Sequence, residues 1–337
     1  MSQFHEPLPP AGGKAQSRTP DPARRTVPPR AGRNVALVLG GGGAAGQAWQ
    51  IGVIAGLAEA GVDLTEAAGL VIGTSAGSTT AAQVRSGLPP AELLAAVLSE
   101  QAQPAGQHRE RPPSLPMAAV FERMRAISAA ATSAAGLQRA MGAFGLESDA
   151  VLEPGAGQRR ALVAARLPRP EWPDRPMIVV ALDAHTGELA AFDRGSGVDL
   201  VDAVTASTAL PGIAPTHAIN GRRYINGGVR SNENADLAAG YAHVVVLSPF
   251  GGRSQAPPQR GAAPGGQFEG LRRLPGADLA GQAEALRKQG SRVEVITPDA
   301  GSLAAMGTNQ MDPATRIPAA RAGFAQGKQE AARVTLP

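Results

Sequence analysis

Residues 35–46 read VALVLGGGGAAG, an uncharged apolar run that passes directly into four consecutive glycines. A short apolar run bounded by glycines is typical of a buried strand. The apolar residues within 48–58 then predict a largely buried helix that ends near Gly61. A strand, a glycine-rich loop and a helix in this order indicate an α/β fold.

The alternation of apolar strands with helices continues along the chain. Further strands are expected at residues 69–72, 177–182, 189–192, 243–248 and 292–296. Helices are expected at residues 77–86, from 91 onward, and at 114–145, 198–206, 278–289 and 311–335. This order predicts an α/β fold with a mainly parallel sheet.

The composition excludes several classes of protein. The 337 residues include no cysteine, which excludes disulfide scaffolds, cysteine-ligated metal sites and cysteine nucleophiles. The net charge of +4 lies entirely in residues 1–33, where six basic residues accompany two acidic ones. The remainder is neutral, which argues against a nucleic-acid-binding surface. The five histidines are scattered without metal-ligand spacing, so no metal site is expected.

Four segments are predicted along the chain. Residues 1–33 are basic, rich in proline and without apolar periodicity, which predicts a disordered tail. Residues 34–250 would form the catalytic core. Residues 251–277 are rich in glycine and proline and predict a flexible insertion, after which residues 278–337 would complete the same domain as helix, strand and helix.

The uncharged stretch 34–58 requires that a membrane span be considered. Four consecutive glycines break a helix, and Gln47 and Gln50 disfavour insertion into a bilayer. The N-terminal tail has no apolar segment of the kind that a secretory signal needs. We therefore expect a cytoplasmic protein, with transient contact at a membrane surface as the peripheral alternative.

A serine lies at the point where the second predicted strand passes into a helix. Residues 73–77 read GTSAG, so that Gly73 and Gly77 flank Ser75 in a G-x-S-x-G pattern. A nucleophile elbow needs this arrangement, because the sharp turn lifts the hydroxyl out of the sheet and the glycines avoid Cβ clashes. The alternative is an ordinary strand–helix turn in which the serine caps the helix.

The glycine loop after the first strand has two interpretations. Gly41-x-Gly43-x-x-Gly46 matches a dinucleotide fingerprint, and Asp63 follows as an acidic residue. That acid precedes the second strand instead of ending it, which is the weakness of this interpretation. In the other interpretation the loop N–H groups lie beside Ser75 and hold the oxyanion of an ester under attack. With 42 glycines in the chain, neither motif is specific by itself.

Taken in order, the motifs resemble those of the bacterial patatin-like phospholipases. After the loop and the serine, the chain continues with residues 205–215 (TASTALPGIAP), 224–229 (YINGGV), 234–236 (NAD) and the strand 244–247, in that family's order. The resemblance covers residues 35–298 in pieces and implies a three-layer α/β/α sandwich with a mainly parallel central sheet.

The resemblance also implies the roles of individual residues. Ser75 would be the nucleophile, in an elbow flanked by Gly73 and Gly77. The oxyanion hole would use the amides of Gly41, Gly42, Gly43 and Ala44, and the dyad motif would comprise Asn226, Gly227 and Gly228. The implied substrates are acyl esters of lipids, phospholipid or acylglycerol, with no metal, organic cofactor or nucleic acid.

The dyad position departs from the family pattern, because it holds Asn226 in place of the aspartate that accepts the serine proton. A neutral amide cannot act as that base. Three explanations stay open: a weak or silent homologue that binds acyl chains; a replacement base; or deamidation at the Asn226-Gly227 sequence. The candidate replacement bases are Asp183, His185, His217 and Asp236. A type I′ turn would also favour the Asn-Gly dipeptide.

The sequence therefore predicts a lipid acyl hydrolase that works through an acyl-enzyme on Ser75, with activity reduced by Asn226. One alternative is a silent lipid-binding or regulatory homologue. Another is a dinucleotide-binding oxidoreductase that uses the loop from Gly41 to Gly46. A further departure is Ala45, where the family often has a basic residue, so contact with a phosphate group at that position is not expected.

Overall fold

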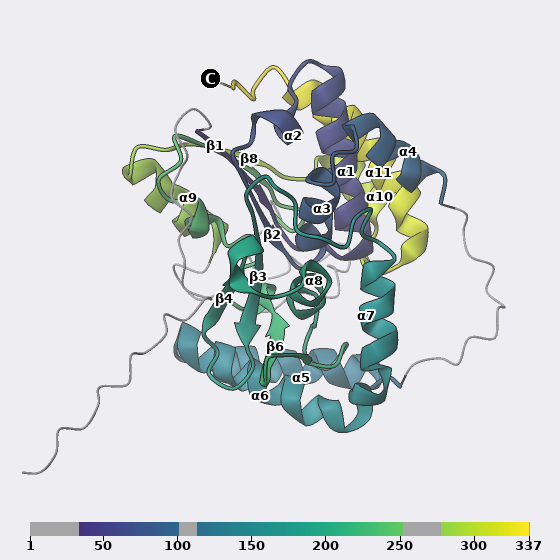
Figure 1. Cartoon of the computed structure of the whole chain (residues 1–337), viewed down its shortest axis with the longest axis vertical. Coiled ribbons are helices and arrows are strands. Elements are labelled where there is room, and N and C mark those ends of the chain that lie inside the picture. The colour runs from purple at the N-terminus through teal and green to yellow at the C-terminus, as the bar shows by residue number, and fades with distance from the viewer. Residues whose placement is uncertain (1–33, 101–112, 252–277, 337) are drawn as a thin grey trace, which may run out of the picture.

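The computed structural model describes residues 34–100, 113–251 and 278–336. The predicted N-terminal tail and the predicted insertion therefore lie almost wholly outside the described residues. Within them, a central sheet is enclosed by helices, as Figure 1 shows.

Eight strands of the described chain form one sheet in the order β5-β6-β3-β2-β1-β7-β8, with β4 paired to β3. Their bounds are β1 Val35–Leu39, β2 Leu70–Thr74, β3 Met177–Asp183, β4 Leu189–Phe192, β5 His217–Ile219, β6 Arg222–Asn226, β7 His243–Leu247 and β8 Arg292–Ile296. The five strands from β8 to β3 run parallel, which confirms the mainly parallel sheet. The pairs of β3 with β4, β3 with β6 and β5 with β6 are antiparallel.

The helices lie on both faces of this sheet. Their bounds are α1 Gly43–Glu59, α2 Leu64–Ala67, α3 Ala76–Val84, α4 Pro90–Leu98, α5 Met117–Ala130, α6 Ala134–Leu152, α7 Ala156–Ala164, α8 Leu200–Ser207, α9 Leu279–Lys288, α10 Ala300–Met306 and α11 Arg316–Glu330. The helical region predicted over residues 114–145 consists of two helices. Ser133 accepts a hydrogen bond from the N–H of Gly136 and thereby caps α6, so α5 and α6 are separate helices.

Successive strand residues point to opposite faces, and this alternation builds two cores. Leu37 and Val71 face the core shared with α1, α3, α4, α8 and α11, whereas Val38 and Ile72 face the core shared with α9. A third apolar cluster joins α5 and α6 to the far end of β3 and to β6. The three-layer α/β/α sandwich is confirmed.

Glycines allow α1 and α11 to pack with their backbones in close contact. A Cβ at Gly52 or at Gly56 would overlap a carbonyl oxygen of α11, and one at Gly323 or Gly327 would overlap a carbonyl oxygen of α1. Trp49 is fully buried in this contact and donates its indole N–H to Gln326 Oε1 at 3.0 Å. The packing fixes α1, whose N-terminus begins in the glycine loop.

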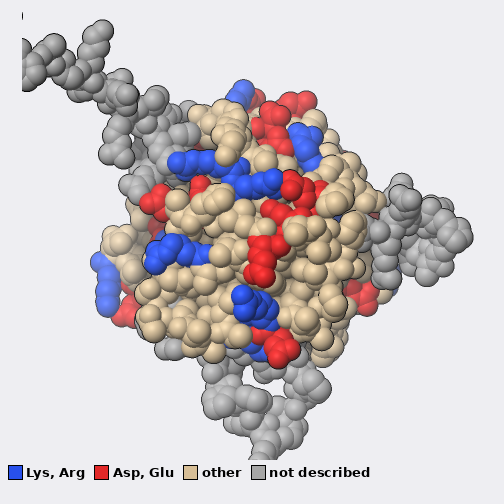
Figure 2. All heavy atoms as spheres, turned by 90° about the horizontal axis from the view of Figure 1, so that it is seen from below, with Lys and Arg blue, Asp and Glu red and all other residues tan. Residues whose placement is uncertain are grey.

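Basic and acidic side chains are interspersed over the described residues in the view of Figure 2. No helix within those residues has the length and apolar character that a membrane crossing requires. The same residues contain no group of three or more His, Asp and Glu placed to hold a metal ion.

Candidate active site

Ser75 occupies the turn between β2 and α3 with a backbone that non-glycine residues rarely adopt. Its φ is 56° and its ψ is −126°. The turn is held on both sides: the Ser75 N–H donates to Ser207 Oγ at 2.9 Å, and the Ser75 carbonyl accepts from the Ser78 hydroxyl at 2.6 Å. The strained turn presents the half-buried Ser75 side chain at the carboxyl end of the parallel sheet.

Glycine is required on either side of this serine. A Cβ at Gly73 would lie 2.5 Å from the Cα of Ser78, and a Cβ at Gly77 would overlap the carbonyl oxygen of Leu39. The turn therefore depends on close contact between α3 and the end of β1.

The glycine loop lies directly beside Ser75, because β1 and β2 are neighbouring parallel strands. A Cβ at Gly41 would lie 3.1 Å from the Cβ of Ser75. The Gly41 N–H already donates to the carbonyl of Asn232 at 3.0 Å. The N–H groups of Gly42, Gly43 and Ala44 have no acceptor among the residues that the structure describes.

Asn226 contacts Ser75 from the side opposite the glycine loop, because β6 and β1 lie on opposite sides of β2 in the sheet. It ends β6 and is buried, with 3% of its surface exposed. Its Nδ2 donates to Ser75 Oγ at 2.9 Å, and its Oδ1 accepts from the Gly228 N–H at 2.7 Å. Two residues that are 151 positions apart in sequence are thus in direct contact.

The interpretation of Asn226-Gly227 as a type I′ turn is wrong. That turn needs positive φ at both central residues, whereas Asn226 has a φ of −53° and the short 3-10 helix η4 begins at Gly227. A Cβ at Gly227 would lie 2.5 Å from the carbonyl oxygen of Val180. The glycine serves close backbone packing against β3.

The direction of the hydrogen bond between Asn226 and Ser75 has a chemical consequence. An amide nitrogen donates, so Ser75 Oγ accepts and its own proton points elsewhere. A carboxylate in the same place would accept from the Gly228 N–H with one oxygen and from the Ser75 hydroxyl with the other. The Asn226 amide itself carries no charge that could accept the Ser75 proton.

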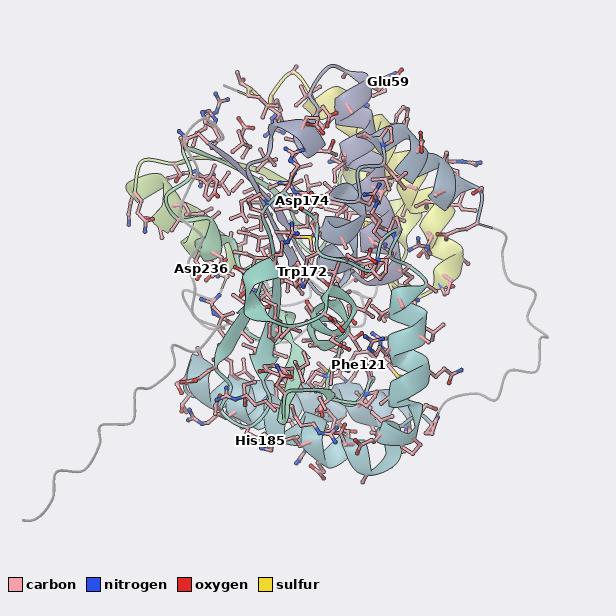
Figure 3. All side chains as sticks on the ribbon, viewed as in Figure 1. Glu59, Phe121, Trp172, Asp174, His185 and Asp236 are labelled. Atoms are coloured by element: carbon pink, nitrogen blue, oxygen red, sulfur yellow. The ribbon has the colours of Figure 1, made fainter. Side chains whose placement is uncertain are left out.

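Three of the four candidate replacement bases have other side-chain partners. Asp183 accepts from the N–H groups of His185 and Thr186, and His217 contacts Asp202 at 2.9 Å. Asp236 pairs with Arg230, and Figure 3 shows His185 and Asp236 in separate parts of the molecule. None of the four lines the cavity that contains Ser75.

The dinucleotide interpretation finds no support in the position of its acidic residue. Asp63 accepts hydrogen bonds from the N–H groups of Thr65 and Glu66 and so caps α2. The strand β2 that should end in a ribose ligand ends at Thr74, directly before Ser75.

A profile of the Patatin-like phospholipase family matches residues 37–239, which is more than half of the chain. The chain belongs to the patatin-like phospholipase family. Similar proteins include an uncharacterized NTE family protein of Mycobacterium bovis and one of Mycobacterium tuberculosis, each 29% identical over 256 residues, or 76% of this chain. The chain spans 59% of the length of these relatives. The crystal structure of VipD from Legionella pneumophila matches with a TM-score of 0.41 and 14% identity, over 89% of this chain and 66% of that one.

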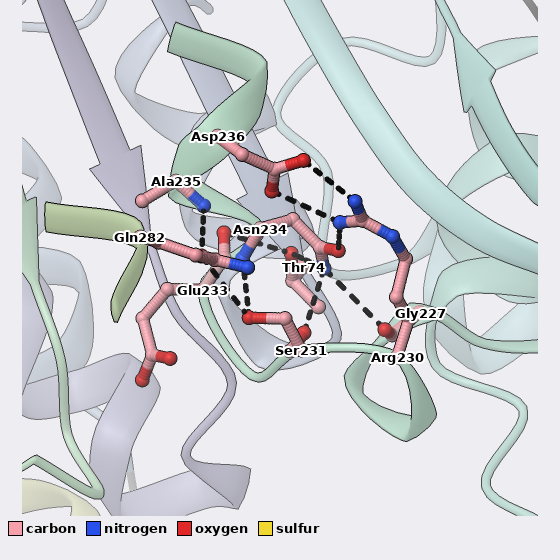
Figure 4. A network of polar contacts seen from close by, with 9 residues as sticks. All are labelled: Thr74, Gly227, Arg230, Ser231, Glu233, Asn234, Ala235, Asp236 and Gln282. Carbon is pink, nitrogen blue, oxygen red and sulfur yellow. Dashed lines mark hydrogen bonds and ion pairs between the residues drawn. The ribbon is translucent and has the colours of Figure 1, made fainter. Parts of the chain in front are cut away.

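In this member of the patatin-like phospholipase family, Asn234 contacts Thr74 and Gly227, the neighbours of the two site residues, as Figure 4 shows. The side chain is fully buried, and its Nδ2 donates to Thr74 Oγ1 at 3.1 Å and to the Gly227 carbonyl at 3.3 Å. Thr74 precedes Ser75 and Gly227 follows Asn226. Arg230 holds the other end of the amide by donating to Asn234 Oδ1 at 2.7 Å. This network sets the distance between the serine and the amide.

Asn232 holds the glycine loop from the same segment. Its carbonyl accepts from the Gly41 N–H, and its Nδ2 donates to the Gly41 carbonyl at 3.0 Å. The buried Glu233 accepts from Asn232 Nδ2 and from Ser248 Oγ. Sequence reasoning placed residues 234–236 in the family order but assigned no role to Asn232 or Asn234, because the contacts that matter for the site, with Gly41 and Thr74, join residues more than 150 positions apart.

A cavity of about 1280 Å³ opens above Ser75. Asn226 and the loop from Gly42 to Ala44 form its floor. Apolar side chains from α4 to α7 line its walls: Leu93, Val97, Met124, Leu137, Met141 and Leu162. Four arginines also line it: Arg159, Arg166, Arg230 and Arg316.

Proposed function

We propose that the protein is a serine acyl hydrolase of lipid esters, with Ser75 as the nucleophile. The observation that carries the proposal is the strained turn at Ser75, placed beside backbone N–H groups that have no acceptor in the described protein. The mainly apolar walls of the cavity fit acyl chains. Family membership supports the same class of substrate.

The reaction would follow from this geometry. Ser75 Oγ adds to the ester carbonyl carbon, and the carbonyl oxygen takes the negative charge within reach of the Gly42 and Gly43 N–H groups. These groups lie at the N-terminus of α1, where the helix dipole favours negative charge. The carbon–oxygen bond then breaks, the alcohol leaves with the serine proton, and water hydrolyses the acyl-serine to release the acid. Gly41 is left out of this oxyanion hole because its N–H is bonded to Asn232.

Asn226 would make this reaction slow. Its amide can hold Ser75 Oγ in place but cannot take the proton that the hydroxyl must lose. The remaining catalysis would come from the oxyanion hole and from binding, as in serine hydrolases that have lost a member of their catalytic unit.

A fluorophosphonate probe tests the proposal on the full chain. We expect covalent labelling that disappears in Ser75→Ala and persists in Ser99→Ala, whose serine is exposed directly after α4. Labelling that survives Ser75→Ala would contradict the assignment of the nucleophile.

A second candidate function is a silent lipid-binding homologue, and the donor role of Asn226 is the observation that favours it. An absence of labelling combined with fatty-acid binding would support this candidate over the hydrolase.

A further inference from the structure

Two arginines line the part of the cavity beside α7, and no carboxylate that the structure describes forms an ion pair with either. Arg159 Nη2 donates to the carbonyl of Thr208 at 3.0 Å, while its Nε is buried and has no hydrogen-bond partner. The side chain of Arg166 has neither a hydrogen bond nor an ion pair with any residue that the structure describes.

The acidic groups of the cavity lining have other partners. Glu100 pairs with Arg316 at 2.6 Å. Asp312 accepts from the N–H of Ala314 and so caps a short turn. Of the other lining arginines, Arg316 is therefore paired, and Arg230 pairs at 2.6 Å with Asp236, which lies outside the lining. Among the described residues, the lining therefore keeps two cations without a counter-ion: Arg159, which is partly buried, and Arg166, whose side chain is exposed.

The lowered pKa values of the two arginines agree with this excess of positive charge. Burial, and next the charge of Arg166, lower the pKa of Arg159 to about 10. Burial, and next the charge of Arg316, lower the pKa of Arg166, with Glu100 acting in the opposite direction. Both guanidinium groups keep their charge at neutral pH and would gain from a bound anion.

Arg159 is linked to the backbone of Ser75 through hydrogen bonds to two consecutive residues. Arg159 bonds to Thr208, and the preceding residue, Ser207, accepts the N–H of Ser75. Leu162 lies between the two arginines in the chain and lines the same cavity, although it is a large apolar side chain with 42% of its surface exposed. Charge and apolar surface thus occur together on α7 and the residues that follow it.

We propose that Arg159 and Arg166 form an anion subsite of the cavity, which binds the phosphate or carboxylate group of an amphiphile whose apolar chain lies along the cavity wall. The inference that the charged end of an acyl ester lies at α7 rests on the proposed function. The inference that the subsite binds an anion does not depend on hydrolysis.

Isothermal titration of the full chain with octyl phosphate, octyl glucoside and inorganic phosphate tests the subsite. Octyl phosphate contains no carboxylic ester, so its binding does not depend on hydrolysis. We expect octyl phosphate to bind about tenfold more tightly than octyl glucoside, the value of one charge-assisted hydrogen bond. Equal affinities of the two octyl compounds would overturn the proposal.

Arg166→Gln is the decisive variant, because the side chain has no partner within the described protein whose loss would unfold it. We expect it to weaken octyl phosphate about tenfold and to leave octyl glucoside unchanged. Lys288→Gln removes the same charge from the exposed face of α9 and should change neither affinity. An Arg166→Gln protein that binds octyl phosphate as wild type does would contradict the subsite.

Inorganic phosphate separates the two sources of the anion. Weak binding of inorganic phosphate beside tight binding of octyl phosphate supports a lipid head group as the ligand. Binding of both with equal strength, lost together in Arg166→Gln, supports a subsite for free phosphate instead. Failure of the esterase test leaves these binding results unchanged, so the two proposals fail separately.

Discussion

Ser75 Oγ and Asn226 Nδ2 lie 2.9 Å apart. The structure around each residue preserves a different part of the proposed ester hydrolysis. The Ser75 side keeps its close-packed glycines, its positive φ and the loop N–H groups that have no acceptor in the described part of the chain. The Asn226 side keeps the position and the contact but replaces a proton acceptor with a donor. Backbone geometry and side-chain chemistry are thus separable in this site, and each can be altered alone.

The largest expected effect comes from restoring the carboxylate. In Asn226→Asp we expect ester hydrolysis to rise on the order of a thousandfold, because the new carboxylate would accept the Ser75 proton while still accepting from the Gly228 N–H. The measurement is p-nitrophenyl ester hydrolysis.

Two controls accompany this variant. Asn220→Asp makes the same chemical change at an exposed turn and should leave the rate unchanged. Mass spectrometry of the wild-type peptide that contains Asn226 shows whether part of the protein has already deamidated. No gain in Asn226→Asp would mean that another base operates or that the site is not catalytic.

The second prediction tests the close backbone contact at the Ser75 turn. Gly77→Ala should lower the free energy of unfolding by about 3 kcal/mol, because its Cβ would overlap the Leu39 carbonyl and force α3 away from β1. Gly157→Ala is the matched control on α7, where a Cβ meets nothing within 4 Å. It should be neutral or stabilising by up to about 1 kcal/mol in the same urea titration. Equal effects of the two substitutions would refute the close contact.

The third prediction loosens the connection between the two sides. Asn234→Ala leaves the hydroxyl of Thr74 and the carbonyls of Gly227 and Ser231 without their shared donor. We expect a loss of about 2 kcal/mol in the free energy of unfolding. In the Asn226→Asp background it should also lower kcat, since the serine and the carboxylate would no longer be held together. A loss of stability without any change in kcat would reduce Asn234 to a structural residue.

The same division explains what the sequence could predict. The turn at Ser75 was predictable because strand, G-x-S-x-G and helix are adjacent in the chain. The antiparallel strands β5 and β6 were not predicted as elements, because they are short and each contains charged or polar residues. The network around Asn234 joins residues up to 160 positions apart, and no local pattern encodes such contacts.

Sequence reasoning also missed the occupied Gly41 amide. The four glycines of the loop are indistinguishable as letters, and only the neighbouring strands decide which N–H groups are already bonded. Asn232 takes the Gly41 N–H because its segment crosses the end of β1. The cations of α7 were missed for a related reason, since the spacing of Arg159 and Arg166 does not reveal that both face the cavity of Ser75.

The smallest expected effect concerns pH and a region outside the site. Burial lowers the pKa of His217, although its hydrogen bond to Asp202 opposes the shift. The folded state therefore binds the His217 proton less readily than the unfolded chain does, so this residue stabilises the protein above its ordinary pKa and the contribution is lost as the pH falls. Urea titrations at pH 7.5 and 5.5 should show a larger loss of stability in the wild type than in His217→Gln, which keeps a donor for Asp202 but does not titrate.

The pH profile of the esterase activity of Asn226→Asp, in contrast, should be the same with and without His217→Gln, because this histidine does not line the cavity. An activity profile that changes with His217→Gln would connect this residue to the site after all.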